Sequence, residues 1–210
     1  MDSSVGRRLG APLGRKDEPQ CAYVCDFRTE PDMRWKRSRL FEPAVSPPLI
    51  LPWIVLNPAG NAANENCGKP FPFVRRGAAW TMAVMSWKWG FSGFITYNLF
   101  PFEHGDPKEI KEPIRRRARD ILASYKKIAS DIAQFDSAIL AWGSELKRET
   151  DEFAPRLMEQ IALMRPSPLI KWRIGQTATG YPFHPSRKRH DSRPERIPEN
   201  GGGAGVRLTQ

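Results

Sequence analysis

Three polar residues that could contact a ligand, Asn57, Asn98 and His184, each come after an apolar segment of the chain. Asn57 ends the run that begins at Leu49, and this run is apolar at nearly every position, as is typical of a strand buried on both faces. The carboxyl ends of parallel strands meet at one edge of a sheet, and open α/β sheets bind ligands there. We therefore expect these three side chains to line one ligand site at that edge.

Each of the three residues also has an interpretation without a ligand. Asn57 precedes Pro58 and can cap the turn through its side chain. Asn98 can hydrogen-bond the backbone of a neighbouring loop, and His184 can make a structural hydrogen bond within a proline-rich loop. Both interpretations stay open for each residue, but their joint placement at one edge favours a site.

Further candidate residues lie near the ends of the predicted strands. Gly60 follows Pro58 and either leaves room for a base or a phosphate or serves only the turn. Trp142 and Gly143 end another apolar segment, where the indole ring either stacks on a ligand or belongs to the core. We include Pro58, Gly60, Trp142 and Gly143 as candidate ligand-binding residues.

The elements that must position these residues alternate between strand and helix along the chain. Such alternation predicts a three-layer α/β sandwich, with a four-stranded mainly parallel sheet in the order 2-1-3-4. A short edge strand at 23–27 and a strand or turn at 34–41 would lie at its rim. The predicted strands are 49–56, 94–100, 137–142 and 168–174, and the predicted helices are 78–88, 107–132 with a kink at Pro113, and 144–164 with an interruption near Pro155.

Length and composition bound the class of protein. A chain of 210 residues with 40% hydrophobic content fits one domain, which we place at 21–186, between a mobile arm at 1–20 and a disordered basic tail at 187–210. No apolar run approaches the roughly 20 residues of a membrane helix, and the amino terminus lacks the apolar region of a signal peptide. We expect a cytoplasmic protein with no membrane partner, and we make no prediction of its oligomeric state.

The charge favours an anionic partner. The chain carries 33 Lys and Arg against 23 Asp and Glu, a net charge of +10. Two arginine pairs can flank the predicted site, Arg37 with Arg39 before the central strand and Arg75 with Arg76 after its loop. They either contact the phosphates of a nucleic acid or form a solvated surface.

The sequence lacks the motifs of several common enzyme and metal-binding classes. The chain contains neither a phosphate-binding loop of the G-x-x-x-x-G-K-[ST] type, nor a G-x-S-x-G nucleophile turn, nor an H-E-x-x-H zinc motif. The spacing of Cys21 and Cys25 is not that of a zinc or redox site, and Cys67 makes the count odd. We therefore expect reduced thiols, no metal site and no cofactor.

Six short motifs, taken in order and spacing, resemble the domain-of-unknown-function family 1643 of bacteria and phages across about residues 34–186. The motifs are W-I-V-L-N-P at 53–58, K-W-G-F-S-G at 88–93, Y-N-L-F at 97–100, D-P at 106–107, A-W-G at 141–143 and G-Y-P-F-H-P at 180–185. The chain departs from the family pattern where Ala62 replaces an expected Asp, where Glu103 replaces an expected Arg, and where Ala79–Thr81 replace an arginine-rich helix start. If those positions carry activity in the family, this chain is altered there.

A more distant resemblance is to uracil-DNA glycosylases, which have a four-stranded parallel sheet and a similar order of motifs. That resemblance implies base flipping, with Asn98 reading the base edge and His184 stabilising the leaving base. It also implies that Asn57 belongs to the catalytic turn and that Asn61 or Asn64 activates the water. We thus predict binding of a nucleobase or nucleotide, in DNA or free, with glycosylase-like chemistry as its catalytic form. The alternatives are a non-catalytic binding or phage-defence module and an enzyme acting on a free nucleoside or another small metabolite.

Overall fold

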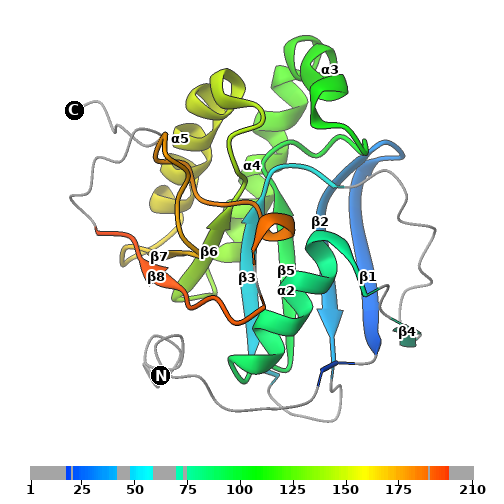
Figure 1. Ribbon diagram of the computed structural model, residues 1–210. Coiled ribbons are helices and arrows are strands. Elements are labelled where there is room, and N and C mark those ends of the chain that lie inside the picture. Colours follow the sequence, from blue (N-terminus) through cyan, green and yellow to red (C-terminus); the bar gives the residue numbers. More distant parts are fainter. Residues whose placement is uncertain are drawn as a thin grey trace.

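Eight strands of the described chain form one mixed sheet, with helices on both faces (Figure 1). The structure is a computed structural model, and it describes residues 18–19, 21–41, 48–58, 70–72, 75–188 and 190–198. The strands are β1 (Cys21–Glu30), β2 (Met33–Leu40), β3 (Ile50–Val55), β4 (Pro70–Pro72), β5 (Gly93–Asn98), β6 (Ser137–Ala141), β7 (Ile170–Arg173) and β8 (Glu195–Arg196). The helices are α2 (Gly77–Lys88), α3 (Lys111–Arg116), α4 (Ala118–Ile132) and α5 (Lys147–Leu163), with 3-10 turns η1 (Pro107–Ile110) and η2 (Pro185–Arg187).

The sheet is larger than the four-stranded sheet predicted from the sequence. Its order is β4-β1-β2-β5-β3-β6-β7-β8. The pairs β4-β1, β1-β2, β2-β5 and β7-β8 are antiparallel. The four predicted strands, β3, β5, β6 and β7, pair in parallel, and they lie in the relative order β5-β3-β6-β7. The prediction was too small because the hairpin of β1 and β2 pairs with β5, and because β8, within the expected tail, pairs with β7.

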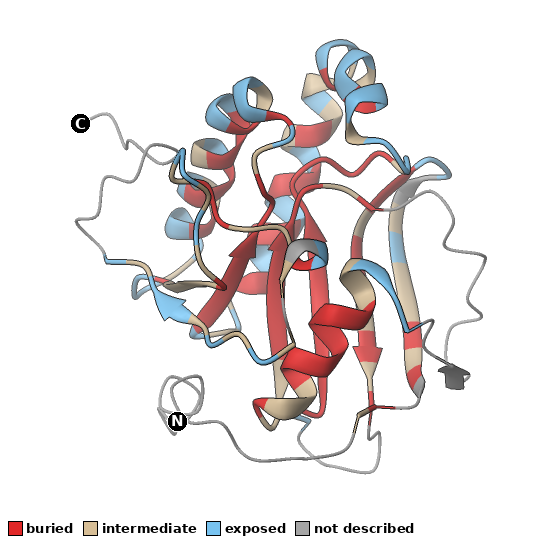
Figure 2. Ribbon diagram, in the orientation of Figure 1, coloured by how far each residue is buried: buried red, intermediate tan, exposed pale blue. Residues whose placement is uncertain are grey.

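Apolar side chains cover both faces of the parallel strands and create two cores. Trp53 and Val55 face one core with α2, whereas Ile54 faces the other core with α4 and α5. Every residue of β5 and β6 is buried, as Figure 2 shows for the centre of the sheet. This burial on both sides explains why the central segments are apolar without alternation.

The helices differ from the prediction at both internal prolines: Pro113 lies within α3, and the break that we expected there falls at Arg117, between α3 and α4. α2 buries seven consecutive residues, Trp80 to Ser86, because the sheet covers one side and η2 also packs against it. α5 continues through Pro155, where we expected an interruption. The core contacts of Phe153 and Leu157 on either side of the proline hold the helix in register across it.

Candidate functional site

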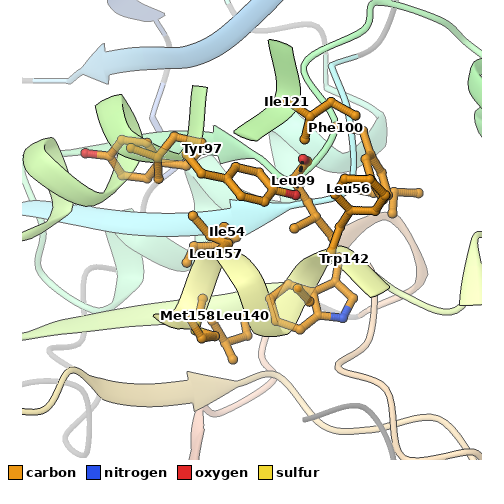
Figure 3. Packing of buried hydrophobic residues seen from close by; sticks show 14 of the residues in the cluster. Ile54, Leu56, Tyr97, Leu99, Phe100, Ile121, Leu140, Trp142, Leu157 and Met158 are labelled. Carbon is orange, nitrogen blue, oxygen red and sulfur yellow. Dashed lines mark hydrogen bonds between the residues drawn. The ribbon is translucent and has the colours of Figure 1, made fainter. Parts of the chain in front are cut away.

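The adjacent strands β3 and β6 send their following helices to opposite faces of the sheet. α2 follows β3 and packs with Trp53, whereas α5 follows β6 and packs with Leu140 on the other face (Figures 1 and 3). In open α/β sheets such a reversal marks the place where ligands bind, outside the carboxyl ends of the two strands. Asn57 and Pro58 follow β3 at this place, and Trp142 and Gly143 follow β6.

His184 lies directly against the carboxyl end of β6. The backbone N–H of Gly143 donates a hydrogen bond of 2.9 Å to the carbonyl of Pro182. Gly143 has φ +74°, and a Cβ at this position would lie 3.1 Å from the Cβ of His184. The Nδ1 of His184 lies 2.8 Å from the hydroxyl of Ser186. The structure thus brings Gly143 and His184 together, and a side chain at Gly143 would both be strained at this φ and press on His184.

The side chain of Asn57 ties two loops together. Its Nδ2 donates to the carbonyl of His104 at 3.0 Å and to the carbonyl of Pro58 at 3.1 Å. The N–H of His104 in turn donates to the carbonyl of Pro58 at 3.1 Å. The bond to Pro58 lies within the turn that Asn57 was expected to cap, and the bond to His104 also holds the loop after β5 against the loop after β3.

His104, which was not among the predicted site residues, is exposed at the same edge. Its Nδ1 accepts a hydrogen bond from the N–H of Asp106 at 3.1 Å. The only sequence signal for this residue was a histidine six positions after Asn98, at the carboxyl end of a predicted strand.

Asn98 is inside the fold. It is 2% exposed, and its Nδ2 donates to the carbonyl of Arg34 at 2.7 Å. This bond joins β5 to β2, next to the bond of 2.8 Å from the N–H of Arg34 to the carbonyl of Pro101. Asn98 and Asn57 lie at one edge, on the neighbouring strands β5 and β3, but the amide group of Asn98 serves a structural bond.

Trp142 belongs to the core on the α5 side. It is 1% exposed and lies in one apolar cluster with Leu140 and Leu157 (Figure 3). Its indole N–H is buried and has no hydrogen-bond partner among the described residues. The ring therefore presents no open face for stacking on a ligand, in agreement with the core interpretation.

Two of the four arginines that we predicted to contact nucleic acid are buried. Arg37 is 3% exposed and forms an ion pair with Asp26 on the neighbouring strand. Arg39 is 8% exposed, and its guanidinium lies 5.2 Å from the ring centre of Phe94, near the amino end of β5. Because of this burial, the prediction that Arg37 and Arg39 contact phosphate was wrong.

Arg75 and Arg76 are exposed immediately before α2. Arg76 is the N-cap residue of α2, but its side chain makes no capping hydrogen bond, and the first turn contains no acidic residue. The first N–H groups of a helix carry a partial positive charge and attract anions. Because α2 packs against η2, which directly follows His184, both arginines and this helix end add positive charge on the side of the sheet that carries His184.

A partly buried ion-pair network lies at the outer part of the same edge. The Nη2 of Arg28 lies 2.7 Å from the Oε1 of Glu103, and the Nη1 of Arg34 lies 3.4 Å from that atom and 3.3 Å from Asp26. Burial raises the pKa of the Asp26 carboxyl, but the hydrogen bond and charge of Arg37 and the charge of Arg34 together bring it below its usual value. Burial and the charge of Arg37 lower the pKa of Arg34, although Asp26 and Glu103 oppose this shift.

Gly60, Asn61 and Asn64 lie outside the described residues. Cys25 is disulfide-bonded, so the expectation of reduced thiols was wrong for this residue; its partner's side chain lies outside the described residues. In the described part of the chain, no group of three or more His, Cys, Asp and Glu residues could hold a metal ion. Among the described helices, none has the length and apolar character needed to cross a membrane.

The chain is an α/β protein with a mixed sheet. Its candidate binding site lies between β3 and β6, where the helices that follow the two strands cover opposite faces of the sheet. Residues 50–186 match the family described as protein of unknown function DUF1643, and the chain belongs to this family. The match begins with the first residue of β3, so β1 and β2 lie outside it. No curated protein and no solved structure matches the chain significantly.

Proposed function

We propose that the protein binds a nucleotide or a nucleobase outside the carboxyl ends of β3 and β6. The observation that carries the proposal is the reversal of helix connections between these adjacent strands, with His184 packed on Gly143 at that place. A nucleotide is favoured over a neutral metabolite because the exposed Arg75 and Arg76 and the start of α2 add positive charge there.

The proposed roles follow from these positions. The N–H groups at the start of α2, with Arg75 and Arg76, would hold phosphate oxygens by charge-assisted hydrogen bonds. The His184 imidazole would contact the base or the sugar. Gly60, Asn61 and Asn64 follow Pro58 in the sequence, and they belong to the proposal on that ground alone.

The test is a binding panel for the full chain by isothermal titration calorimetry. It comprises free nucleosides, nucleoside mono- and triphosphates, and duplex and single-stranded oligonucleotides with normal and modified bases. Phosphorylated ligands should bind, and Arg75→Ala with Arg76→Ala should weaken them about tenfold or more, since a hydrogen bond to a charged group contributes about 1.5–3 kcal/mol. His184→Ala should weaken nucleotides and nucleosides alike.

Lys126→Ala with Lys127→Ala is the matched control, because both lysines are exposed in α4 and the double change removes the same charge. If no compound of the panel binds, or if the control weakens binding as much as the arginine variant does, the proposal is wrong. Base release from DNA, followed by chromatography, would show glycosylase-like chemistry, and binding without release would identify a binding module. Binding of nucleosides alone would favour the enzyme acting on a free nucleoside.

A further inference from the structure

The segment after β5 carries exposed cations that have no ion-pair partner within the described residues. They are Lys108 in η1, Lys111 and Arg115 in α3, and Arg119 at the start of α4. In contrast, the neighbouring Arg116 pairs with Glu112 at 2.6 Å. On most protein surfaces cations and carboxylates are interspersed, so a group of unpaired cations favours an anionic partner.

The buried residues of this segment fix the direction of its cations. Ile110 and Ile114 are both 2% exposed and anchor one side of the segment in the core with α4 and α5. Lys111 and Arg115 each follow one of these anchors and are four residues apart, so they lie on the same helix face, about 6 Å apart along the axis. Lys111 and Arg115 thus share the solvent side of α3, and Lys108 in η1 and Arg119 in α4 are exposed before and after them in the chain. We call these four residues the α3 basic face: Lys108, Lys111, Arg115 and Arg119.

The α3 basic face lies at the edge that contains the candidate site. Hydrogen bonds from Asn57 to His104, and from His104 to Pro58, hold the loop before η1 against the end of β3. Arg117, between α3 and α4, pairs with Asp32 at the turn of β1 and β2 at 2.6 Å. Figure 1 shows α3 beyond the ends of these strands. Positive charge therefore flanks the edge from the start of α2 and from α3.

We infer that the α3 basic face binds the sugar-phosphate backbone of a nucleic acid, whose base or terminal nucleotide occupies the proposed site. This inference rests on the proposed function for the occupant of the site, but the charge of the face argues for the backbone independently. A membrane surface fits less well, because interfacial binding needs apolar side chains beside the cations. The exposed large apolar residues of the described chain, Phe27, Leu163 and Met164, lie outside this segment.

The experiment measures the affinity of the full chain for a fluorescein-labelled 20-base-pair duplex by anisotropy, between 50 and 200 mM KCl. The variant is Lys111→Gln with Arg115→Gln, and the matched control is Lys126→Gln with Lys127→Gln, which removes the same charge from exposed positions of α4. Each phosphate contact contributes about −0.9 to the slope of log affinity against log salt. The wild-type affinity should therefore fall about 12-fold more over this range than that of the variant, whereas the control should keep the wild-type slope.

Two further measurements separate this inference from the proposed function. Binding of a mononucleotide should be unchanged in the α3 variant, and equal thermal unfolding of the two double variants shows that both are folded. If DNA binds with the expected change in slope while neither a mononucleotide nor a nucleoside binds, the backbone contact of the α3 basic face holds and the proposed site fails. An unchanged slope, an equal change in the control, or tighter variant-sensitive binding to vesicles of phosphatidylcholine and phosphatidylserine would overturn the inference.

Discussion

Replacement of Gly143 by alanine tests the contact that brings His184 to the end of β6. The backbone of Gly143 has φ +74°, and an added Cβ would lie 3.1 Å from the Cβ of His184. Gly77 offers a matched control, because its φ is +78° and an added Cβ would meet nothing within 4 Å. The two substitutions share the backbone strain, and only the first adds the contact.

The expected magnitudes follow from these two contributions. A left-handed conformation costs an alanine about 1–2 kcal/mol, of which about 0.4–1 kcal/mol is offset by the lower entropy of the unfolded chain. Gly77→Ala should therefore lower the free energy of unfolding by about 1 kcal/mol. In Gly143→Ala the added methyl group also pushes the segment of His184 away, which stretches the bond from Gly143 to Pro182. Loss of that bond costs about 1 kcal/mol, so the total should be about 2 kcal/mol.

Urea unfolding of the two variants and the wild type measures this difference. An additional loss of about 1 kcal/mol in Gly143→Ala corresponds to about a fivefold change in the unfolding equilibrium constant. Gly143→Ala should also weaken nucleotide binding, because it displaces His184. Equal losses of stability in the two alanine variants would refute the contact argument, whatever the binding result.

Three further predictions concern the charged interior. Asp26→Asn should lower stability at pH 7 by roughly 3 kcal/mol in urea unfolding, because Arg37 loses its carboxylate partner, and a loss below about 0.5 kcal/mol would contradict the ion pair's importance. The pKa of Asp26 is lowered in the folded protein, so the stability that this carboxylate contributes should be complete above about pH 4 and be lost as the pH falls below that value. In acid, the free energies of unfolding of the wild type and Asp26→Asn should therefore become equal. Tyr97→Phe should lower the free energy of unfolding by about 1–2 kcal/mol, because the Tyr97 hydroxyl donates a hydrogen bond to Asp131. Burial, and after it the Asp131 carboxylate, raises the pKa of the Tyr97 hydroxyl. Absorbance at 295 nm should therefore show no ionisation of Tyr97 in the folded protein near pH 10.

The central part of the fold could be predicted because its sequence signal is local. β3, β5 and β6 are short apolar runs that end at Asn or Gly, and burial on both faces makes such runs necessary in a parallel sheet. Their relative order also followed, since right-handed connections leave few alternatives. The proximity of Gly143 and His184 is a consequence of that order.

The segments 23–27 and 34–41 were expected at the rim of the sheet, but the sequence did not predict that they form a long hairpin, β1 and β2, that pairs with β5. The inward-facing residues of this hairpin include Asp26, Arg37 and Arg39, which in isolation resemble a solvated surface. Arg37 and Arg39 are buried because other strands compensate them: Asp26 of β1 forms an ion pair with Arg37, and the ring of Phe94 in β5 lies against Arg39. A hydrophobicity pattern shows that these positions are charged, but it does not show which residues of other strands pair with them.

The two asparagines show a similar limit at the candidate site. The sequence placed Asn57 and Asn98 at one edge, but their amide groups can serve either a ligand or the backbone. Only the positions of the neighbouring backbone segments decide, and here the carbonyl of His104 in a loop and the carbonyl of Arg34 in β2 receive the two amides. The structural interpretation therefore holds for these bonds, and the proposal shifts towards His184 and the start of α2.

Glu103 links the departure from the family pattern to the hairpin. The resemblance implies an arginine at this position, and in this chain the glutamate pairs with Arg28 and Arg34, from β1 and β2. Those strands lie outside residues 50–186, so the part of the chain beyond the family match supplies the positive charges. Glu103 also belongs to the loop whose next residue, His104, receives the amide of Asn57. The acidic residue thus stabilises the loop that holds the candidate site, which gives this departure a structural role.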